Sequence, residues 1–388
     1  MTITLAILFW ISGFSIFYSM IGYPLVLILL DKLFKPKKHA RDYSYIPSVT
    51  IMVVAHNEEK VIQEKLKNVS ELDYPNDKIE ILVASDNSTD ATNEIVKTFI
   101  QANPEKRIRL FEVKERKGKT NAQNEAQKTV QSEILVMTDA NAMIKENAIK
   151  ELVSLFIEPS IVYVSGRLSY VNSLDNSTSY AESSYWDLDL KMRDIESRFQ
   201  TITAGNGALY AVRNSEYIDF DPIRCHDSAM PQYYGLHKKK ALFCPTAIAY
   251  EKAGENDGDE FKRKIRMARG ILRSVFPNPA MLNIFRLKWF SFFYFGHRVV
   301  RSALFLSHIV VFLASLFLAL NGQTFYLSML IFQLIVYFLA LLPKVGIQNK
   351  LIKFISYYCM TILAQAIGAY RMITGKSKPF WEKAESTR

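Results

Sequence analysis

The distribution of apolar residues along the chain is the feature that most constrains its fold. Residues 3–30 carry no charge, residues 36–275 have the mixed polarity of a globular domain, and apolar runs dominate again from about residue 285. The first apolar segment is long enough to cross a bilayer as a helix, which rises about 1.5 Å per residue. The pattern therefore predicts a polar domain held between membrane-embedded ends.

Basic residues mark one side of the expected membrane. Lys32, Lys35, Lys37, Lys38 and Arg41 directly follow the first apolar segment, and positively charged flanks usually remain in the cytoplasm. We therefore predict a multi-pass protein of the cell membrane whose polar domain is cytoplasmic. The net charge of +10 does not indicate a nucleic-acid partner, because no nucleic-acid motif accompanies it. Three cysteines without a CxxC spacing suit a reducing compartment.

The C-terminal apolar region contains three candidate membrane spans, at about 302–320, 324–342 and 351–373. The preceding residues, 276–301, mix apolar and basic side chains and predict an amphipathic helix that lies in the membrane interface. With a cytoplasmic polar domain, three spans after it would leave the C-terminal tail outside the cell. Because this tail is basic, it is more favourable on the cytoplasmic side. Two alternatives would place it there: one of the three segments is re-entrant, or residues 285–300 also cross the membrane.

Five segments follow from these patterns. They are an N-terminal membrane anchor at 1–34, a polar domain at 45–270, an interfacial helical region at 271–298, membrane helices at 299–374 and a tail at 375–388.

Strands and helices alternate through the first part of the polar domain. Short apolar runs predict strands at 49–55, 79–85, 108–114 and 133–139, and helical periodicity lies between them. This alternation predicts an α/β domain with a mainly parallel sheet. Asp86 and Asp139 stand where two of the strands end, so both are expected at the rim where such sheets bind ligands.

The polar turn TDAN (138–141) is a candidate metal site. Asp139 and Asn141 occupy alternate positions and can offer hard oxygen ligands to Mg²⁺ or Mn²⁺ bridging a diphosphate. In the alternative, Asp139 only caps the following helix. No GxxxxGK[ST] and no GxGxxG after a strand is present, so a P-loop or dinucleotide site loses its main support.

Seven motifs together resemble the family 2 glycosyltransferases, in order and in spacing. They are AHNEE (55–59), ASDNSTDAT (84–92), RKGKTNAQNEA (116–126), TDANA (138–142), GNGALYAVR (205–213), HDSAMP (226–231) and EFKRKIRMARG (260–270). The resemblance covers residues 48–270 and implies an inverting enzyme with a GT-A fold that uses a nucleotide-activated sugar.

The resemblance implies a donor site at the first strand ends. Its expected members are Ala55, Asn57, Glu58, Asp86, Gly118 and Lys119, with Asp86 bonded to uracil and Gly118 and Lys119 matching the family's GK. Asp139 would bind the metal. Asn141 stands where the family most often has a second aspartate, which implies weaker binding of the metal by the protein.

The resemblance places the acceptor beside Gly205, Asn206 and Gly207, where the absence of side chains lets a sugar approach the backbone. Asp227 matches the general base, which takes the proton from the acceptor hydroxyl. His226 replaces an acidic residue, either as a solvent-facing loop histidine or as a residue that tunes the base. Asp219 and Asp221 are fallback candidates for the base.

Arg263 and Arg266 are expected to neutralise the departing diphosphate, because they lie three residues apart on one helix face. Alternatively, this basic helix rests on lipid headgroups. Processive members of the family usually have QxxRW here, and this chain lacks its glutamine and tryptophan.

We therefore predict a membrane-anchored enzyme that transfers a sugar from a UDP-sugar to a lipid-linked or growing polysaccharide acceptor. One alternative is a processive synthase that also exports its polymer. A scaffold or transporter with a degenerate transferase domain is the alternative from another class, since Asn141, His226 and Met267 depart from the family pattern.

Overall fold

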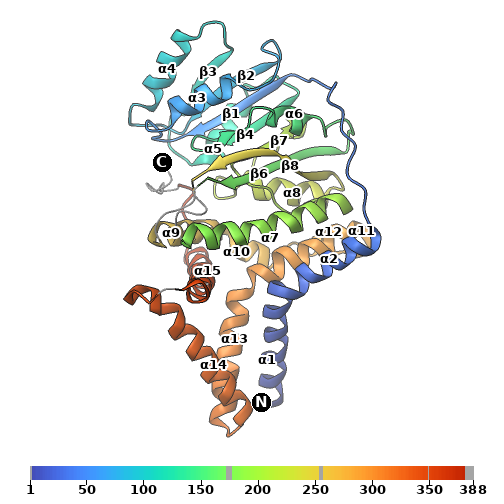
Figure 1. Ribbon diagram of the computed structural model, residues 1–388, viewed down its shortest axis with the longest axis vertical. Coiled ribbons are helices and arrows are strands. Elements are labelled where there is room, and N and C mark those ends of the chain that lie inside the picture. Colours follow the sequence, from blue (N-terminus) through green and yellow to red (C-terminus); the bar gives the residue numbers. More distant parts are fainter. Residues whose placement is uncertain (1, 172–176, 253–256, 348, 381–388) are drawn as a thin grey trace.

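The computed structural model describes residues 2–171, 177–252, 257–347 and 349–380. A sheet domain stands on a layer of helices, from which a narrower helical stalk extends (Figure 1). The described chain begins at the far end of the stalk, and its last described residues, Pro379 and Phe380, lie beside the sheet domain.

One sheet forms the centre of the domain, with the strand order β3-β2-β1-β4-β7-β6-β8-β5. Its strands are β1 (Val49–Ala55), β2 (Ile79–Ser85), β3 (Ile108–Glu112), β4 (Ile134–Asp139), β5 (Met143–Ile144), β6 (Ile161–Tyr170), β7 (Leu209–Arg213) and β8 (Lys240–Glu251). β1 pairs in parallel with β2 and β4, and β2 pairs in parallel with β3, whereas β7 is antiparallel to β4 and β6. The predicted α/β fold with a mainly parallel sheet is confirmed.

Helices cover both faces of this sheet. They are α3 (Ile62–Ser70), α4 (Thr92–Ala102), α5 (Lys119–Gln127), α6 (Ala148–Val153), α7 (Ser177–Phe199) and α8 (His226–Leu236). Alternate residues of β1 enter different cores: Ile51 and Val53 share one with α3, α4 and α6, and Met52 and Val54 share the other with α5 and α8. Burial on both faces explains why the strands are continuous apolar runs.

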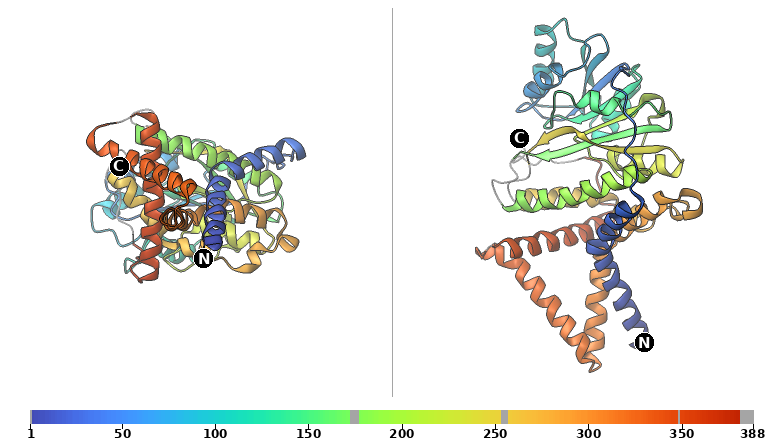
Figure 2. Two further views of the ribbon diagram at one scale, coloured as in Figure 1. Left: turned by 90° about the horizontal axis from the view of Figure 1, so that it is seen from below. Right: turned by 45° about the vertical axis from the view of Figure 1, so that its right-hand side comes forward.

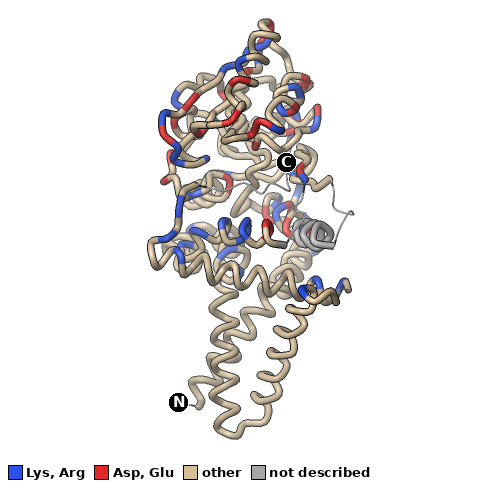
Figure 3. The backbone as a smooth tube through the Cα atoms, turned by 90° about the vertical axis from the view of Figure 1, so that its left-hand side faces the viewer, with Lys and Arg blue, Asp and Glu red and all other residues tan. Residues whose placement is uncertain are grey.

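Three helices without a charged residue form the stalk: α1 (Thr2–Phe17), α13 (Leu304–Leu320) and α14 (Thr324–Leu341). α1 packs along α13, with Phe9 buried against Val311 and Leu318. Figure 3 shows the stalk without Lys, Arg, Asp or Glu, and Lys and Arg gathered where the stalk meets the sheet domain.

A base layer separates the stalk from the sheet domain. It consists of α2 (Tyr23–Phe34), α12 (Trp289–Phe293), the π-helical segment η5 (Tyr294–Val300) and α15 (Lys350–Ile373). Figure 2 shows α15 running across the base of the domain, and α15 contacts α7, α9 (Asp257–Met267) and α10 (Ile271–Val275). Gly368 permits this approach, since a Cβ there would lie 2.6 Å from the Cβ of Ala268.

The predicted interfacial helix differs from the structure. Residues 276–301 form several short pieces, including α11 (Ile284–Leu287), α12 and η5. Pro277 and Pro279 interrupt the segment, because proline cannot donate a backbone hydrogen bond. Its aromatic residues Phe290 and Phe293 are buried beneath the domain instead of facing lipid.

Length and composition make three helical stretches candidates to cross a membrane: Thr2–Phe34, Thr324–Val345 and Lys350–Ile373. A fourth candidate is the pair Trp289–Val300 and Leu304–Leu320, which is bent by 56°. The spatial arrangement favours α1, α13 and α14 as the crossing elements, because α15 lies across the base (Figure 2).

Candidate active site

The carboxyl ends of β1 and β2 form one rim of the site. The backbone N–H of Asp86 donates to the carbonyl of Ala55 (2.9 Å), and the side chain of Asn57 accepts from the N–H of Thr89 (2.7 Å). Asn57 has a φ of 54°, a left-handed conformation that asparagine tolerates better than most residues. The N–H of Glu58 donates to the hydroxyl of Thr92 (2.7 Å), so the predicted donor residues at the two strand ends hold each other in place.

Asp86 organises the loop that carries the GK motif. Its carboxylate is buried and accepts from the backbone N–H groups of Lys117 (3.2 Å) and Gly118 (3.0 Å). Burial raises the pKa of Asp86, and the hydrogen bond from Lys117 opposes this rise. The assignment of Asp86 to a uracil base stays a prediction; the contacts show a role in positioning Gly118 and Lys119.

Lys119 joins this loop to the end of β4. Its ammonium group forms an ion pair with Asp139. Burial opposes its charge, but the carboxylates of Asp139 and Asp227 together raise the pKa of Lys119. The residues predicted from three separate motifs therefore surround one point.

The metal site predicted at Asp139 and Asn141 has a partial set of oxygen donors. Asp139 is partly exposed, and the side-chain N–H of Asn141 donates to Glu251 (2.8 Å), which leaves its carbonyl oxygen as the atom suited to a cation. No cluster of three or more His, Cys, Asp or Glu in the described part of the chain could hold a metal. These donors fit Mg²⁺ or Mn²⁺ only when a ligand diphosphate supplies further oxygens.

Lys65 lies directly behind this turn and was missed from the sequence. It is fully buried in α3, and its ammonium group donates to the hydroxyl of Thr138 (2.9 Å) and to the carbonyl of Ala142. Burial lowers the pKa of Lys65 to about 7, against the opposite effect of Asp139. The sequence spacing could have predicted this burial, because Lys65 lies on the same helix face of α3 as the apolar residues Ile62 and Val69.

The GNG loop lies next to Asp227 and Lys119. The N–H of Gly205 donates to the carbonyl of Asp227 (2.7 Å). A Cβ on Gly205 would lie 2.1 Å from the hydroxyl of Tyr163, and one on Gly207 would lie 3.1 Å from Nζ of Lys119. Asn206 is buried and shapes the loop, because its side chain accepts from the N–H groups of Ala208 (3.1 Å) and Leu209 (3.2 Å).

Asp227 is the second residue of α8 and is partly buried. Burial raises the pKa of its carboxyl, Lys119 limits this rise, and Asp139 adds to it. An aspartate whose pKa is raised is a stronger base than an exposed one, which suits proton abstraction. The predicted base, metal ligand and acceptor loop are therefore within electrostatic reach of one another.

The expectation of a solvent-facing His226 is wrong. The ring is buried, with Nδ1 2.8 Å from Oε1 of Gln123 and Nε2 3.1 Å from the hydroxyl of Tyr217. Burial lowers the pKa of His226 to about 3, and the charge of Lys119 adds to this effect. His226 is therefore neutral at physiological pH and fixes the start of α8.

The two predicted diphosphate arginines differ in their surroundings. Arg263 makes a forked contact with the buried carboxylate of Glu260, at 2.7 and 3.0 Å. Arg266 is near enough to Asp139 to feel its charge, while burial and Arg263 lower the pKa of Arg266. Arg266 therefore lies within electrostatic range of the predicted metal site.

The C-terminal segment returns to the donor side. A Cβ on Gly118 would lie 2.6 Å from the carbonyl oxygen of Pro379, and Arg269 donates to that oxygen (3.0 Å). The guanidinium of Arg116 lies 5.4 Å from the centre of the Phe380 ring. No sequence pattern predicted this contact.

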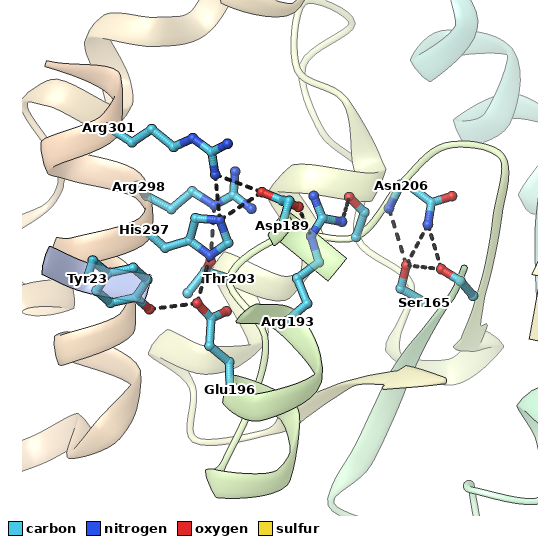
Figure 4. A network of polar contacts seen from close by, with 12 residues as sticks. Tyr23, Ser165, Asp189, Arg193, Glu196, Thr203, Asn206, His297, Arg298 and Arg301 are labelled. Carbon is cyan, nitrogen blue, oxygen red and sulfur yellow. Dashed lines mark hydrogen bonds and ion pairs between the residues drawn. The ribbon is translucent and has the colours of Figure 1, made fainter. Parts of the chain in front are cut away.

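A buried polar network connects the base layer to the acceptor loop (Figure 4). His297 of η5 contacts Glu196 (2.7 Å) and Asp189 (2.9 Å), both from α7, so it is satisfied structurally, as expected for a histidine in an apolar segment. Arg193 pairs with Asp189 (2.6 Å) and donates to the carbonyl of Gly205 (2.7 Å). Arg193 was also missed, because nothing in the sequence shows that this helical pair is buried.

Comparison with known proteins shows to which protein family the sheet domain is related. Residues 50–215 match the model of glycosyl transferase family 2. This part of the chain is a family 2 glycosyltransferase domain. The predicted resemblance is confirmed.

Relatives of this glycosyltransferase domain include enzymes of lipid and polysaccharide glycosylation. The chain is 30% identical over 145 residues to the beta-monoglucosyldiacylglycerol synthase of Nostoc sp., covering 37% of this chain and 31% of that protein. It is 25% identical over 271 residues to the poly-beta-1,6-N-acetyl-D-glucosamine synthase of Staphylococcus epidermidis, covering 68% of this chain and 62% of that protein. The chain thus spans about a third of the first of these relatives and under two thirds of the second.

Nearly the whole chain is similar in fold to a solved structure. The mannosyltransferase PcManGT from Pyrobaculum calidifontis, solved in complex with GDP-Man and Mn²⁺, matches with a TM-score of 0.73 at 21% identity. The match covers 95% of this chain and 99% of that chain, so it includes the stalk and base layer as well as the glycosyltransferase domain. The fold is therefore that of a GT-A glycosyltransferase with appended apolar helices.

Proposed function

We propose that the chain is a membrane-anchored, inverting glycosyltransferase that transfers a sugar from a UDP-sugar to a lipid-linked or growing polysaccharide acceptor. The observation that carries the proposal is the convergence of Asp139, Asp227 and the GNG loop around Lys119. These residues come from four distant parts of the chain, and a protein that only bound a partner would not need them together.

In the proposed reaction, the carboxylate of Asp227 takes the proton from the acceptor hydroxyl. The hydroxyl oxygen forms a bond to the anomeric carbon of the donor sugar, and the bond from that carbon to the diphosphate oxygen breaks. The bonding electrons leave with the nucleotide diphosphate, whose charge Lys119 and Arg266 stabilise. Gly205 and Gly207 leave room for the acceptor beside the backbone.

Asp139 and the carbonyl oxygen of Asn141 would hold Mg²⁺ or Mn²⁺ in this proposal. The ion supplies charge that stabilises the departing diphosphate. Ala55, Asn57, Glu58 and Asp86 would hold the nucleoside, and Arg263 would assist Arg266 from its position beside Glu260.

The membrane arrangement supports an acceptor met at the bilayer. The acceptor-side loop is linked through Arg193 and Asp189 to the base layer, and the stalk that follows is apolar. Relatives named for a glucosyldiacylglycerol and for a poly-N-acetylglucosamine support lipid-linked and polymeric acceptors respectively. The missing QxxRW residues favour a single transfer over processive synthesis. In this proposal the catalytic domain lies on the cytoplasmic side of the cell membrane, the side that the basic residues after the first apolar segment favour.

The test is release of the nucleoside diphosphate by the purified full-length chain with Mn²⁺ and a panel of UDP- and GDP-sugars. We expect at least one UDP-sugar to be consumed, and the Asp227→Asn variant to lose about 100- to 10,000-fold in rate, as expected for a missing general base. Product sizing on a gel separates one transfer from polymerisation.

A matched control is Asp221→Asn, which makes the same change at an exposed position in the loop before α8. It should retain activity. Equal loss in both variants would assign the base elsewhere, and no release with any donor would favour the scaffold or transporter.

A further inference from the structure

A cavity lies where the glycosyltransferase domain meets the base layer. Its volume is about 290 Å³, and α7, α8, the segment 263–274, η5 and α15 line it. On one side it reaches Ser228, the neighbour of Asp227, and on the other it reaches Thr361 and Gln365 of the apolar helix α15. It therefore lies between the start of α8, the helix that carries Asp227, and the base layer.

The lining of this cavity is strongly cationic. Seven arginines and one lysine line it, and Asp189 is the single acidic residue among the described lining residues. Asp189 is shared by Arg193 (2.6 Å) and Arg301 (2.8 Å). Glu260, just outside, contacts Arg263 (2.7 Å) and Lys264 (3.4 Å). Glu196 and Asp221 also act on Arg298 and Arg224 from outside the lining, so cations still outnumber the carboxylates around the cavity among the described residues.

Four of these arginines have no carboxylate within ion-pair distance among the residues that the structure describes: Arg224, Arg269, Arg273 and Arg298. Arg224 lies over the ring of Phe220, and Arg269 donates to Sγ of Cys225 (3.1 Å) and to Pro379. Arg298 donates to Thr203 through Nε (3.0 Å). Its Nη2 is buried, and no described residue accepts a hydrogen bond from it. A buried guanidinium donor without a partner is costly.

The cluster of arginines in this cavity favours the binding of an anion. Guanidinium groups collected in a partly buried site repel one another unless an anion balances them. Burial and the charge of Arg273 lower the pKa of Arg224, which shows this repulsion. Planar guanidinium groups match phosphate oxygens in paired hydrogen bonds, so a phosphate is the anion that suits this lining best.

The donor diphosphate is not the anion that this cavity fits. Asp139, Lys119 and Arg266 mark the donor side and do not line the cavity, whereas Arg263, the other arginine predicted to contact the diphosphate, lines it from beside Glu260. The lining instead includes residues of η5 and α15, two elements of the base layer.

We propose that this cavity binds the phosphate group of a membrane lipid that presents its hydroxyl or sugar to Asp227. The proposal rests on the proposed transferase function, since it names the chemical class of the acceptor. The phosphate would contact Arg298 from the base layer and Arg273 from α10, and the acyl chains would leave along α15.

The test measures binding of the full-length chain to phosphatidylcholine vesicles with and without phosphatidic acid, which serves as the probe. We expect phosphatidic acid to bind saturably, and Arg273→Gln and Arg298→Gln each to weaken this binding about tenfold, the loss of one charge-assisted contact. Arg273 is exposed, so its variant should fold even if Arg298→Gln does not. The control is Arg286→Gln in α11, an exposed arginine outside the cavity with the same change of charge.

Three outcomes would overturn the lipid site. The first is that Arg286→Gln weakens binding to phosphatidic acid as much as the cavity variants do. The second is that inorganic phosphate competes for the site as strongly as phosphatidic acid does, and the third is that Arg273→Gln lowers the affinity for UDP instead of the affinity for lipid. Arginine-dependent lipid binding without release of UDP from any donor would contradict the transferase function while retaining the site. Release of UDP without such binding would contradict only the site.

Discussion

At the scale of single residues, the raised pKa of Asp227 predicts how the activity depends on pH. Only the carboxylate can accept the proton, so activity should fall as the pH falls through this pKa. Burial and Asp139 raise the pKa, whereas Lys119 and Arg193 oppose the rise. We expect the acid limb of kcat/KM, measured by UDP release, to lie above the ordinary aspartate value of about 3.9. In Lys119→Met this limb should move to still higher pH; movement to lower pH would contradict the role of Lys119.

The raised pKa of Asp227 also predicts the stability of the Asp227→Asn variant, which tests whether that variant is folded. A carboxyl whose pKa is raised in the folded state stabilises the protein at pH values below its unfolded pKa, and this contribution is lost as the pH rises through the folded pKa. Asp227→Asn removes the buried charge, so its thermal midpoint at pH 7 should equal or exceed that of the original chain. A lower midpoint would show that the loss of activity reflects unfolding.

At the scale of elements, the C-terminal segment lies against the GK loop, which we expect to contact the nucleotide. Phe380 stacks on Arg116, and Pro379 lies against Gly118. A cation–π contact at an exposed site contributes about 0.5–1 kcal/mol, so Phe380→Ala should tighten UDP binding by about two- to fivefold. Calorimetric titration with UDP and Mn²⁺ measures this change.

The control for this prediction is Phe285→Ala, which removes a ring that is 95% exposed and lies in α11. It should leave the affinity unchanged. Weaker UDP binding in Phe380→Ala would instead identify the ring as part of the nucleotide site.

At the scale of the whole molecule, the arrangement predicts that the two termini lie on opposite sides of the membrane. The N-terminus is at the far end of the stalk, and the segment up to Phe380 lies beside the glycosyltransferase domain (Figure 1). In sealed vesicles, a protease added to the domain side should remove a C-terminal tag and spare an N-terminal one. Removal of both tags from one side would require a different set of crossing helices.

Several parts of the site could be predicted from the sequence, because their positions depend only on neighbouring residues along the chain. The turns after β2 and β4 carry Asp86 and Asp139 because parallel strands end at a common rim. The alternative of a solvent-facing His226 failed, because its burial depends on Gln123 and Tyr217, which approach it only in the folded chain. The single interfacial helix failed because packing beneath the domain overrode its apolar and basic pattern.

The sequence by itself determined the apolar ends, the alternation of strands and helices, and the donor-side motifs, since each is a pattern of near neighbours along the chain. Only the tertiary structure decided that α15 lies across the base, that Pro379 reaches Gly118, and that arginines from α7 to η5 surround one cavity. These features join residues more than a hundred positions apart, and such contacts arise from packing that no local pattern specifies.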